Sequence, residues 1–339
     1  MPDQSIFHLK PLYAACLLFL LFAAIVGCKT RRLIPAQAPA PVVYKAPANF
    51  RVVGYLLSGE IANGTAAAFN LSRVNYLNIF FNGQDAHHKL REMPHLDSTI
   101  AAAHRLHVTV LASIGNATKL SLLSDTSRAD FIDSLVKSVE ELHLDGVDVD
   151  LEGKSINNNY EAFVGNLAAG LKQHGKLLTA AIATWESELL TDKALSYFDF
   201  LNVMTYDDTG PWRLNEPGPH SPYSMAVTDM DFWTNKRHIP KNKLNLGLPF
   251  YGYSFGPGLK HEFHYWEIVQ QYPGAENADK ASAAPGDTVY YNGIPTIKKK
   301  TAFAMQNAGG VMVWELLEDA AGDKSLLTAI DRTVNPADQ

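Results

Sequence analysis

Residues 144–153 read LDGVDVDLEG and place four carboxylates within eight positions of a stretch that is otherwise Gly and aliphatic. Residues two apart share a face of a β-strand, so Asp148, Asp150 and Glu152 point one way and the aliphatic residues point the other. In a parallel barrel the aliphatic face packs against the surrounding helices. We therefore expect the acids to line the barrel interior and to climb towards its carboxyl-terminal mouth.

Strand-like runs alternate with helical patterns along the rest of the chain. Apolar residues recur at helical spacing from Phe131 to Leu142 and from Tyr160 to Leu171. This alternation indicates a parallel sheet, and eight strands fit a closed (β/α)8 TIM barrel. An open doubly wound sheet is the alternative, but no Gly-rich phosphate loop follows the first strand. The eight candidate strands are Val52–Leu57, Tyr76–Phe81, Val108–Ser113, Gly146–Leu151, Leu177–Ala183, Phe200–Tyr206, Leu244–Phe250 and Gly310–Trp314.

The segment from Tyr251 to Asp287 is rich in Gly, Pro and aromatic residues. It predicts a long loop with a short helix near Trp266, beside the mouth of the barrel. We therefore expect a single domain over residues 50–339, without a large α+β insertion.

The first 28 residues predict a lipoprotein signal peptide. The apolar run from Pro11 to Val26 is shorter than the roughly 20 residues of a transmembrane helix. Small residues precede Cys28 as in a bacterial lipobox, where cleavage leaves this cysteine as a lipid-carrying N-terminus. An uncleaved anchor is the alternative. Residues 29–49 are rich in Pro and Ala and predict a tether, so we expect a lipid-anchored domain in the bacterial cell envelope.

Charge and cysteine content exclude some classes of protein. The net charge of −6 argues against a nucleic-acid partner, which normally requires a basic face. The run from Lys298 to Lys300 reads as a solvated helix face. Cys16 and Cys28 are the only cysteines, so the mature domain has no disulfide. We expect a monomer with no metal and no cofactor.

The acidic strand has the residue types that general acid catalysis needs. Burial and like-charge repulsion raise the pKa of at least one carboxyl in such a stack, and a general acid near neutral pH requires a raised pKa. Glu152 lies nearest the mouth and is assigned as the proton donor. Asp150 would share a proton with it and orient the substrate, and Asp148 would hold charge below them. Asp145 would stabilise the turn before the strand.

Two other interpretations of this stretch stay open at the level of sequence. A calcium-binding loop of the EF-hand type requires Gly at its sixth position and Glu at its twelfth. Gly153 fits the first requirement, but Asn159 stands at the second. The other alternative is an acidic turn without function.

The pattern D-G-x-D-x-D-x-E over residues 145–152 resembles the signature of glycoside hydrolase family 18, the family of chitinases and endo-β-N-acetylglucosaminidases. It falls on the fourth candidate strand, where that family carries it. Four other segments resemble family motifs in the same order. They are Ser113–Gly115 on the third strand, Met204–Asp207 on the sixth, Leu246–Gly252 on the seventh and Gly309–Glu315 on the eighth.

The resemblance implies a retaining mechanism assisted by the substrate, an exception to the usual scheme of two carboxylates. Glu152 would protonate the glycosidic oxygen, and Asp150 would bond the acetamide nitrogen and stabilise an oxazolinium ion. Tyr206 would donate to the acetamide oxygen, which attacks the anomeric carbon. Asp207 would bind near the same sugar, with Trp314 as the floor beneath it.

The sequence departs from the family pattern at three places. Leu151 replaces the usual Trp between the last Asp and Glu, but it should point outward and leave the acids in place. Asn116 replaces the second Gly of the third-strand motif and changes a subsite wall. Gly153 and Lys154 follow the catalytic acid in place of Tyr-Pro.

Several aromatic residues are candidates for sugar binding. Trp185 and Trp212 follow the fifth and sixth strands, where they either stack on sugar rings or pack within loops. Tyr55 and Met204 are expected to line the pocket. The remaining three candidates are assigned mainly structural roles, and they are Trp233, Trp266 and His220.

The resemblance favours hydrolysis of β-1,4-linked N-acetylglucosamine in chitin or its oligosaccharides. An endo-β-N-acetylglucosaminidase that cuts N-glycan cores would use the same acids and is the first alternative. A surface lipoprotein that binds glycans without catalysis is the second, although the presence of Glu152 argues against it. In each case the partner is a glycan that contains N-acetylglucosamine.

Overall fold

The computed structural model describes residues 49–64, 70–81, 83, 89–118, 125–256, 260–284 and 286–336. The predicted signal peptide, Cys28 and residues 29–48 of the predicted tether lie outside these ranges. No helix within the described ranges has the length and apolar character needed to cross a membrane.

Eight parallel strands close into a barrel in which each strand pairs with its two neighbours, and the last strand pairs with the first. The predicted (β/α)8 fold is confirmed. The sixth strand ends three residues earlier than predicted, because the Thr205 side chain bonds the carbonyl oxygen of Gly247 as the chain bends out of the sheet. The strands are β1 (Arg51–Leu57), β2 (Tyr76–Phe81), β3 (Thr109–Gly115), β4 (Gly146–Asp150), β5 (Leu177–Ile182), β6 (Phe200–Val203), β7 (Leu244–Pro249) and β12 (Gly310–Trp314).

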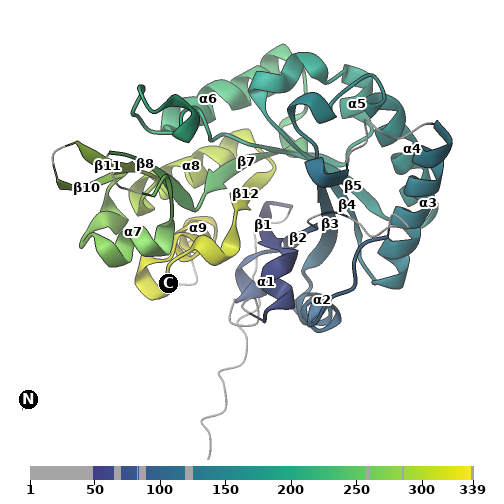
Figure 1. Ribbon diagram of the computed structural model, residues 1–339, viewed down its shortest axis with the longest axis horizontal. Helices are drawn as coiled ribbons and strands as arrows, with labels where there is room; N and C mark the ends of the chain where they lie inside the picture. The colour runs from purple at the N-terminus through teal and green to yellow at the C-terminus, as the bar shows by residue number, and fades with distance from the viewer. Residues whose placement is uncertain are drawn as a thin grey trace, which may run out of the picture. The chain divides into compact units, whose positions relative to one another are not determined.

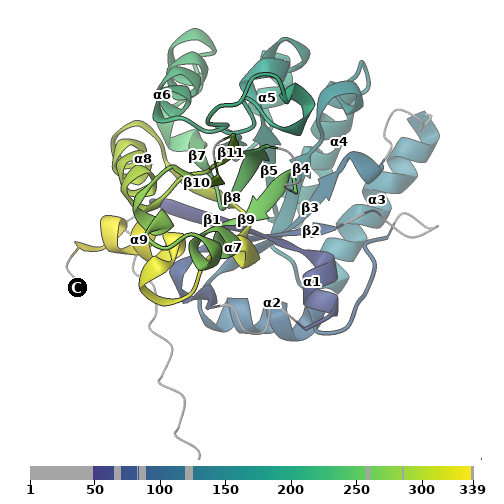
Figure 2. The ribbon, with the colours of Figure 1, turned by 60° about the vertical axis from the view of Figure 1, so that its left-hand side comes forward.

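Helices surround the barrel on its outside (Figures 1 and 2). The two helical patterns in the sequence are confirmed as α3 and α4, whose apolar residues face the strands. A π-helical turn, Phe232–Lys236, extends α6. The helices are α1 (Ser58–Ala62), α2 (Leu96–Arg105), α3 (Asp125–Glu141), α4 (Tyr160–Gln173), α5 (Asp192–Ser196), α6 (Tyr223–Asp231), α8 (Ile294–Asn307) and α9 (Leu326–Val334).

The alternation of side chains along each strand builds two separate apolar clusters. On β4, Val147 and Val149 join the large cluster between barrel and helices, and Leu151 follows them there. On β1, Val53 and Tyr55 instead belong to the small cluster inside the barrel. Leu151 therefore points outward as predicted, and the acids of β4 are left on the interior face.

The predicted long loop between the seventh and eighth barrel strands is wrong, but the short helix predicted near Trp266 is confirmed. The segment forms a four-stranded antiparallel sheet in the order β10-β11-β8-β9, together with a helix. Tyr251, Tyr253 and Phe255 alternate along its first strand, and the Gly and Pro content of the segment hid this period of two. In the view of Figure 1 the sheet lies on the side of the molecule away from α3 and α4. Its elements are β8 (Tyr251–Phe255), β9 (Glu262–His264), α7 (Tyr265–Gln271), β10 (Lys280–Ala284) and β11 (Asp287–Tyr290).

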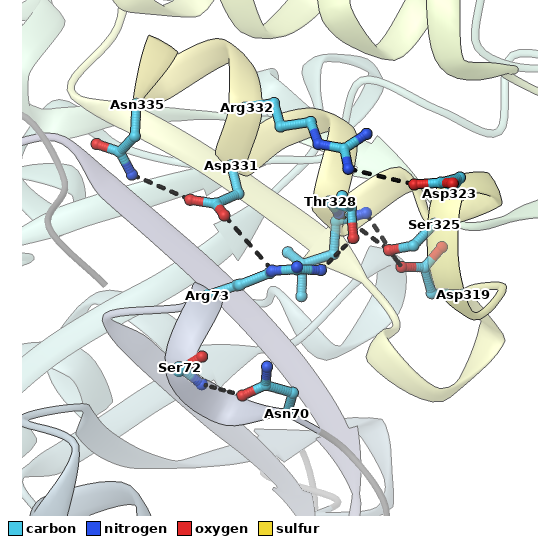
Figure 3. A network of polar contacts seen from close by, with 11 residues as sticks. Asn70, Ser72, Arg73, Asp319, Asp323, Ser325, Thr328, Asp331, Arg332 and Asn335 are labelled. Carbon is cyan, nitrogen blue, oxygen red and sulfur yellow. Dashed lines mark hydrogen bonds and ion pairs between the residues drawn. The ribbon is translucent and has the colours of Figure 1, made fainter. Parts of the chain in front are cut away.

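A polar network ties the last helix to the start of the barrel (Figure 3). Arg73, in a short turn before β2, forms an ion pair with Asp331 of α9 at 3.4 Å and donates to the Thr328 hydroxyl. Asp319 accepts the backbone N–H groups of Leu326 and Leu327 at 2.7 and 3.0 Å and so caps the helix. Burial raises the pKa of Asp319 to about 6.

The interpretation of Lys298–Lys300 as a solvated face is wrong for its last residue. Lys298 and Lys299 are exposed, but Lys300 lies on the inward face of α8 and is fully buried. Its ammonium donates to Ser221 O, Ser221 Oγ and Asn292 Oδ1, each at 2.7 Å. A run of like charges does not reveal which member the helix turns inward.

Candidate active site

Asp148 lies deepest of the acids on β4 and is fully buried. The Tyr55 hydroxyl donates to it at 2.7 Å, Ser113 at 2.9 Å and Thr179 at 2.5 Å. Asn202 adds a longer bond at 3.3 Å. Burial raises the pKa of Asp148, while these neutral donors lower it by stabilising the carboxylate. The four donors therefore oppose the effect of burial on the deepest carboxyl of the row.

Asp150 lies one step nearer the mouth and is 6% exposed. Its Oδ1 atom has no hydrogen-bond partner among the described residues. Burial raises the pKa of Asp150 well above its ordinary value, and the charges of Glu152, Asp148 and Glu186 raise it further. Unlike the oxygens of Asp148, this buried oxygen receives no donor from the described ranges that would stabilise the ionised carboxyl.

Glu152 follows β4 directly and is only partly buried, which places it at the opening of the acid row. Its backbone N–H donates to Asn116 Oδ1 at 2.9 Å. Asn116, which departs from the family motif, thus holds the peptide of the predicted proton donor. Burial raises the pKa of Glu152, and the nearby charge of Asp207 raises it further. A raised pKa suits a proton donor.

Tyr206 belongs to the cluster inside the barrel, with its hydroxyl 3.8 Å from Met312 Sδ. Burial raises the pKa of its phenol, and so do the charges of Asp150, Asp207 and Glu152. The buried tyrosine therefore lies within electrostatic reach of Asp150 and Glu152, and its role in catalysis stays a prediction.

Asp207 adopts a left-handed backbone conformation, with φ of +67°. The Tyr251 hydroxyl donates to its Oδ1 at 2.6 Å, and His220 Nδ1 lies 3.5 Å from the same oxygen. His220 is fully buried and packs against the rings of Tyr251 and Tyr253. Sequence analysis missed Tyr251 and gave His220 only a structural role. The alternation Tyr-Gly-Tyr was the available signal for the first.

The predicted aromatic site residues lie in different parts of the molecule: some inside the barrel, some on the surface and one in the hydrophobic core. Trp314 contacts the rings of Tyr55 and Phe80, with centroids 5.3 and 5.6 Å apart, and Met204 packs against the same interior cluster. These contacts place Trp314, Tyr55 and Met204 at the cluster inside the barrel, and their predicted roles in sugar binding stay predictions. Trp233 is fully buried and is a core residue.

The two tryptophans expected near the mouth keep large free surfaces. Trp185 is 67% exposed and Trp212 is 56% exposed. Trp212 touches Tyr253 with one ring edge, at a centroid distance of 5.4 Å. Loop packing therefore leaves most of both rings free. Trp266 is also exposed and stacks on His264.

The geometry of β4 contradicts the calcium-loop interpretation. Residues 146–150 form a barrel strand instead of a loop, and Asp148 is occupied by protein donors. Asp145 accepts the N–H of Val110 at 2.8 Å and contacts His104 at 2.9 Å, so it stabilises the approach to the strand. The described residues contain no group of three or more His, Cys, Asp or Glu arranged to hold a metal ion.

A barrel with graded acids on its fourth strand and a tyrosine beside them agrees with the comparison to known families. The model of glycosyl hydrolases family 18 matches residues 51–319. The chain belongs to glycosyl hydrolases family 18. This membership supports a chitinase-like glycoside hydrolase.

Solved structures and curated relatives agree with this family 18 assignment. The chitinase ChiB from the chitin utilization locus of Flavobacterium johnsoniae is 32% identical, with a TM-score of 0.73 over 86% of this chain and 95% of that chain. A chitinase from Bacteroides thetaiotaomicron is 25% identical, with a TM-score of 0.72 over 86% and 98%. Chitinase 63 of Streptomyces plicatus is 28% identical over 279 residues, which are 66% of this chain but 45% of that relative. The chain thus spans less than half of the length of this relative.

Proposed function

We propose that this protein hydrolyses the β-1,4 linkages of chitin or chitooligosaccharides, with retention of configuration and with assistance from the substrate's own acetamido group. One observation carries the proposal: Asp148 and Asp150 are buried on β4, Glu152 follows the strand directly, and the charges of Asp150 and Glu152 act on the buried phenol of Tyr206. The chitinases among its relatives support the choice of substrate.

In the first step, the carboxyl of Glu152 gives its proton to the glycosidic oxygen as the bond from this oxygen to the anomeric carbon breaks. The acetamide oxygen of the same sugar forms the new bond to that carbon, which yields an oxazolinium ion. Tyr206 donates to the acetamide oxygen and holds it in place for attack. Asp150 accepts the acetamide N–H, and its charge stabilises the cation.

In the second step, the Glu152 carboxylate takes a proton from water, and the water oxygen attacks the anomeric carbon. The bond to the acetamide oxygen breaks, and the acetamido group is restored. Two attacks on opposite faces leave the configuration unchanged. Positioned proton transfer of this kind contributes roughly 10²–10⁴-fold to the rate.

The test replaces Glu152 by Gln and measures hydrolysis of chitotetraose. We expect kcat to fall by roughly 10²–10⁴-fold while the oligosaccharide still binds. The exposed Glu188 gives a matched control, since Glu188→Gln leaves the cavity intact. Undiminished turnover by the Glu152 variant would reject the assigned donor. Cleavage of a high-mannose glycopeptide but not of chitotetraose would select the endo-β-N-acetylglucosaminidase.

We further propose that Cys28 carries a lipid that anchors the domain in the bacterial cell envelope. Support for this proposal comes from the apolar run and the small residues that precede this cysteine. Cells that express the protein should incorporate labelled palmitate into it, and Cys28→Ser should prevent the labelling. Equal labelling of both proteins would contradict the proposed anchor.

A further inference from the structure

Glu186 is a buried acid beside the site that the family motifs do not include. It lies in the short helical turn Thr184–Leu189 after β5 and is 1% exposed. Its Oε2 atom accepts the backbone N–H of Gly153 at 3.0 Å, and its Oε1 atom accepts that of Ala183 at 3.2 Å. One carboxylate thus joins the ends of β4 and β5.

The first of these bonds falls on the residue next to the proton donor. Gly153 follows Glu152 and adopts a left-handed conformation, with φ of +54°. The preceding N–H, that of Glu152 itself, is held by Asn116 at the end of β3. Side-chain acceptors from the two neighbouring strands therefore hold two successive amides of the catalytic turn.

The charged groups that face Glu186 come from several elements. Asp150 faces it from the end of β4, and Glu152 faces it from the turn that follows. The buried phenol of Tyr160 faces it from α4. Arg237 binds the outer side of the same turn, where it donates to Ser187 O and Leu190 O at 2.7 and 2.6 Å. Burial raises the pKa of Glu186 to about 7, and its two amide bonds oppose that rise.

The turn that contains Glu186 also carries an exposed aromatic ring. Trp185 precedes Glu186, and its Cη2 atom lies 3.6 Å from the position that a Cβ on Gly153 would occupy. The ring therefore borders the turn of the proton donor. By holding the Glu152–Gly153 turn, the Glu186 side chain also fixes the distance between the proposed proton donor Glu152 and the ring of Trp185.

We propose that Glu186 is a positioning residue for the reaction, whose carboxylate holds the Glu152–Gly153 turn against the turn that bears Trp185. The inference rests on the proposed hydrolase function. The backbone N–H groups of Gly153 and Ala183 each donate to one oxygen of Glu186. The ionised carboxylate is therefore the form in which both oxygens accept a hydrogen bond. Its charge also raises the pKa of Asp150, the acid assigned to share a proton with Glu152, and so keeps the acid row protonated to higher pH.

Three variants separate the effect of the two hydrogen bonds of Glu186 from the effect of its charge. Glu186→Gln keeps the shape but has one acceptor oxygen, so one backbone N–H faces an amide NH₂ group. Glu186→Asp keeps the charge but is too short to reach both N–H groups. Glu188→Gln removes an exposed carboxylate two residues away and is the control.

The first measurement is the pH profile of kcat on chitotetraose. We expect Glu186→Gln to lower kcat by roughly 10–100-fold, because a small displacement of a catalytic group has an effect of this order, and to move the alkaline limb to lower pH. Glu186→Asp should lower kcat without shifting the alkaline limb of the pH profile. Glu188→Gln should change neither kcat nor the position of that limb. Inactive wild-type protein would contradict the hydrolase function instead.

The second measurement does not depend on activity. Hydrogen exchange at the amide of Gly153 should accelerate in Glu186→Gln and Glu186→Asp but not in Glu188→Gln. Wild-type exchange at Gly153 in the Glu186 variants would overturn the inference. A lower kcat that accompanies a lower thermal midpoint, with the alkaline limb in place in Glu186→Gln, would assign a merely structural role and overturn it too.

Discussion

Replacing Lys300 by Met should remove a large part of the pH dependence of stability. Burial lowers the pKa of Lys300 to about 7, against 10.5 for a free lysine. Asp279 and Asp229 act in the opposite direction and raise it. The native protein thus binds fewer protons than the unfolded chain between about pH 7 and pH 10.5. Its free energy of unfolding therefore rises with pH across this window.

The size of the effect follows from the shift in pKa. Each unit corresponds to about 1.4 kcal/mol, so the full window is worth about 5 kcal/mol. From pH 7.5 to pH 9.5 the wild-type protein should gain about 2–3 kcal/mol from this residue. In Lys300→Met this gain is absent. The variant also leaves Asn292 Oδ1 without the lysine donor, which costs about 1–3 kcal/mol at every pH.

The assay is urea unfolding followed by tryptophan fluorescence at pH 7.5, 8.5 and 9.5. Other groups titrate in both proteins, so the difference between wild type and Lys300→Met isolates the lysine. Lys298→Met, on the exposed face of the same helix, is the control and should follow wild type. Parallel pH dependence in wild type and Lys300→Met would refute the reasoning, because it would mean that the buried amine keeps an ordinary pKa.

Three further predictions concern the site and the barrel. Tyr206→Phe removes the donor to the acetamide oxygen and should lower kcat by about 10²-fold with little change in KM, a split that steady-state kinetics resolves. Trp185→Ala and Trp212→Ala should each weaken binding of long oligosaccharides by about 2–10-fold, measured by calorimetry, and unchanged affinity would exclude stacking at that ring. Gly146→Ala would place a Cβ 2.2 Å from the carbonyl oxygen of Leu177, so it should lower the free energy of unfolding by more than about 3 kcal/mol in a denaturant titration.

Local pattern in the sequence was enough to predict the barrel and the acid row. Alternation along β4 places acids and aliphatic residues on opposite faces whatever the rest of the chain does, and the structure has this arrangement. The order of strands and helices leaves few topologies open. The predicted roles of Glu152, Asp150 and Tyr206 stay predictions, although the structure brings the two acids within electrostatic reach of the tyrosine.

Features that depend on contacts between distant segments could not be predicted in this way. Glu186 lies in a short polar stretch whose sequence predicts an exposed loop. Only folding brings its carboxylate to the backbone N–H of Gly153. Lys300 is the third of three lysines, and its burial depends on the segment at Ser221 that packs against α8. Tyr251, which follows β7, donates to Asp207, which follows the neighbouring strand β6. The Tyr-Gly-Tyr alternation indicates the strand that carries Tyr251, but not its partner.

The donors around each acid explain how one strand provides different chemistry at successive positions. Asp148 has four neutral donors, which stabilise its charge, whereas the buried Oδ1 of Asp150 has none within the described part of the chain. Within the row, the pKa of Asp150 is raised further than that of Asp148, so a shared proton is favoured at Asp150 over Asp148. In the proposed mechanism, a sugar that donates its acetamide N–H to Asp150 would stabilise the ionised form of that carboxyl and lower its pKa. The proton would then be favoured on Glu152, so that binding of the N-acetyl group would itself prepare the proposed proton donor.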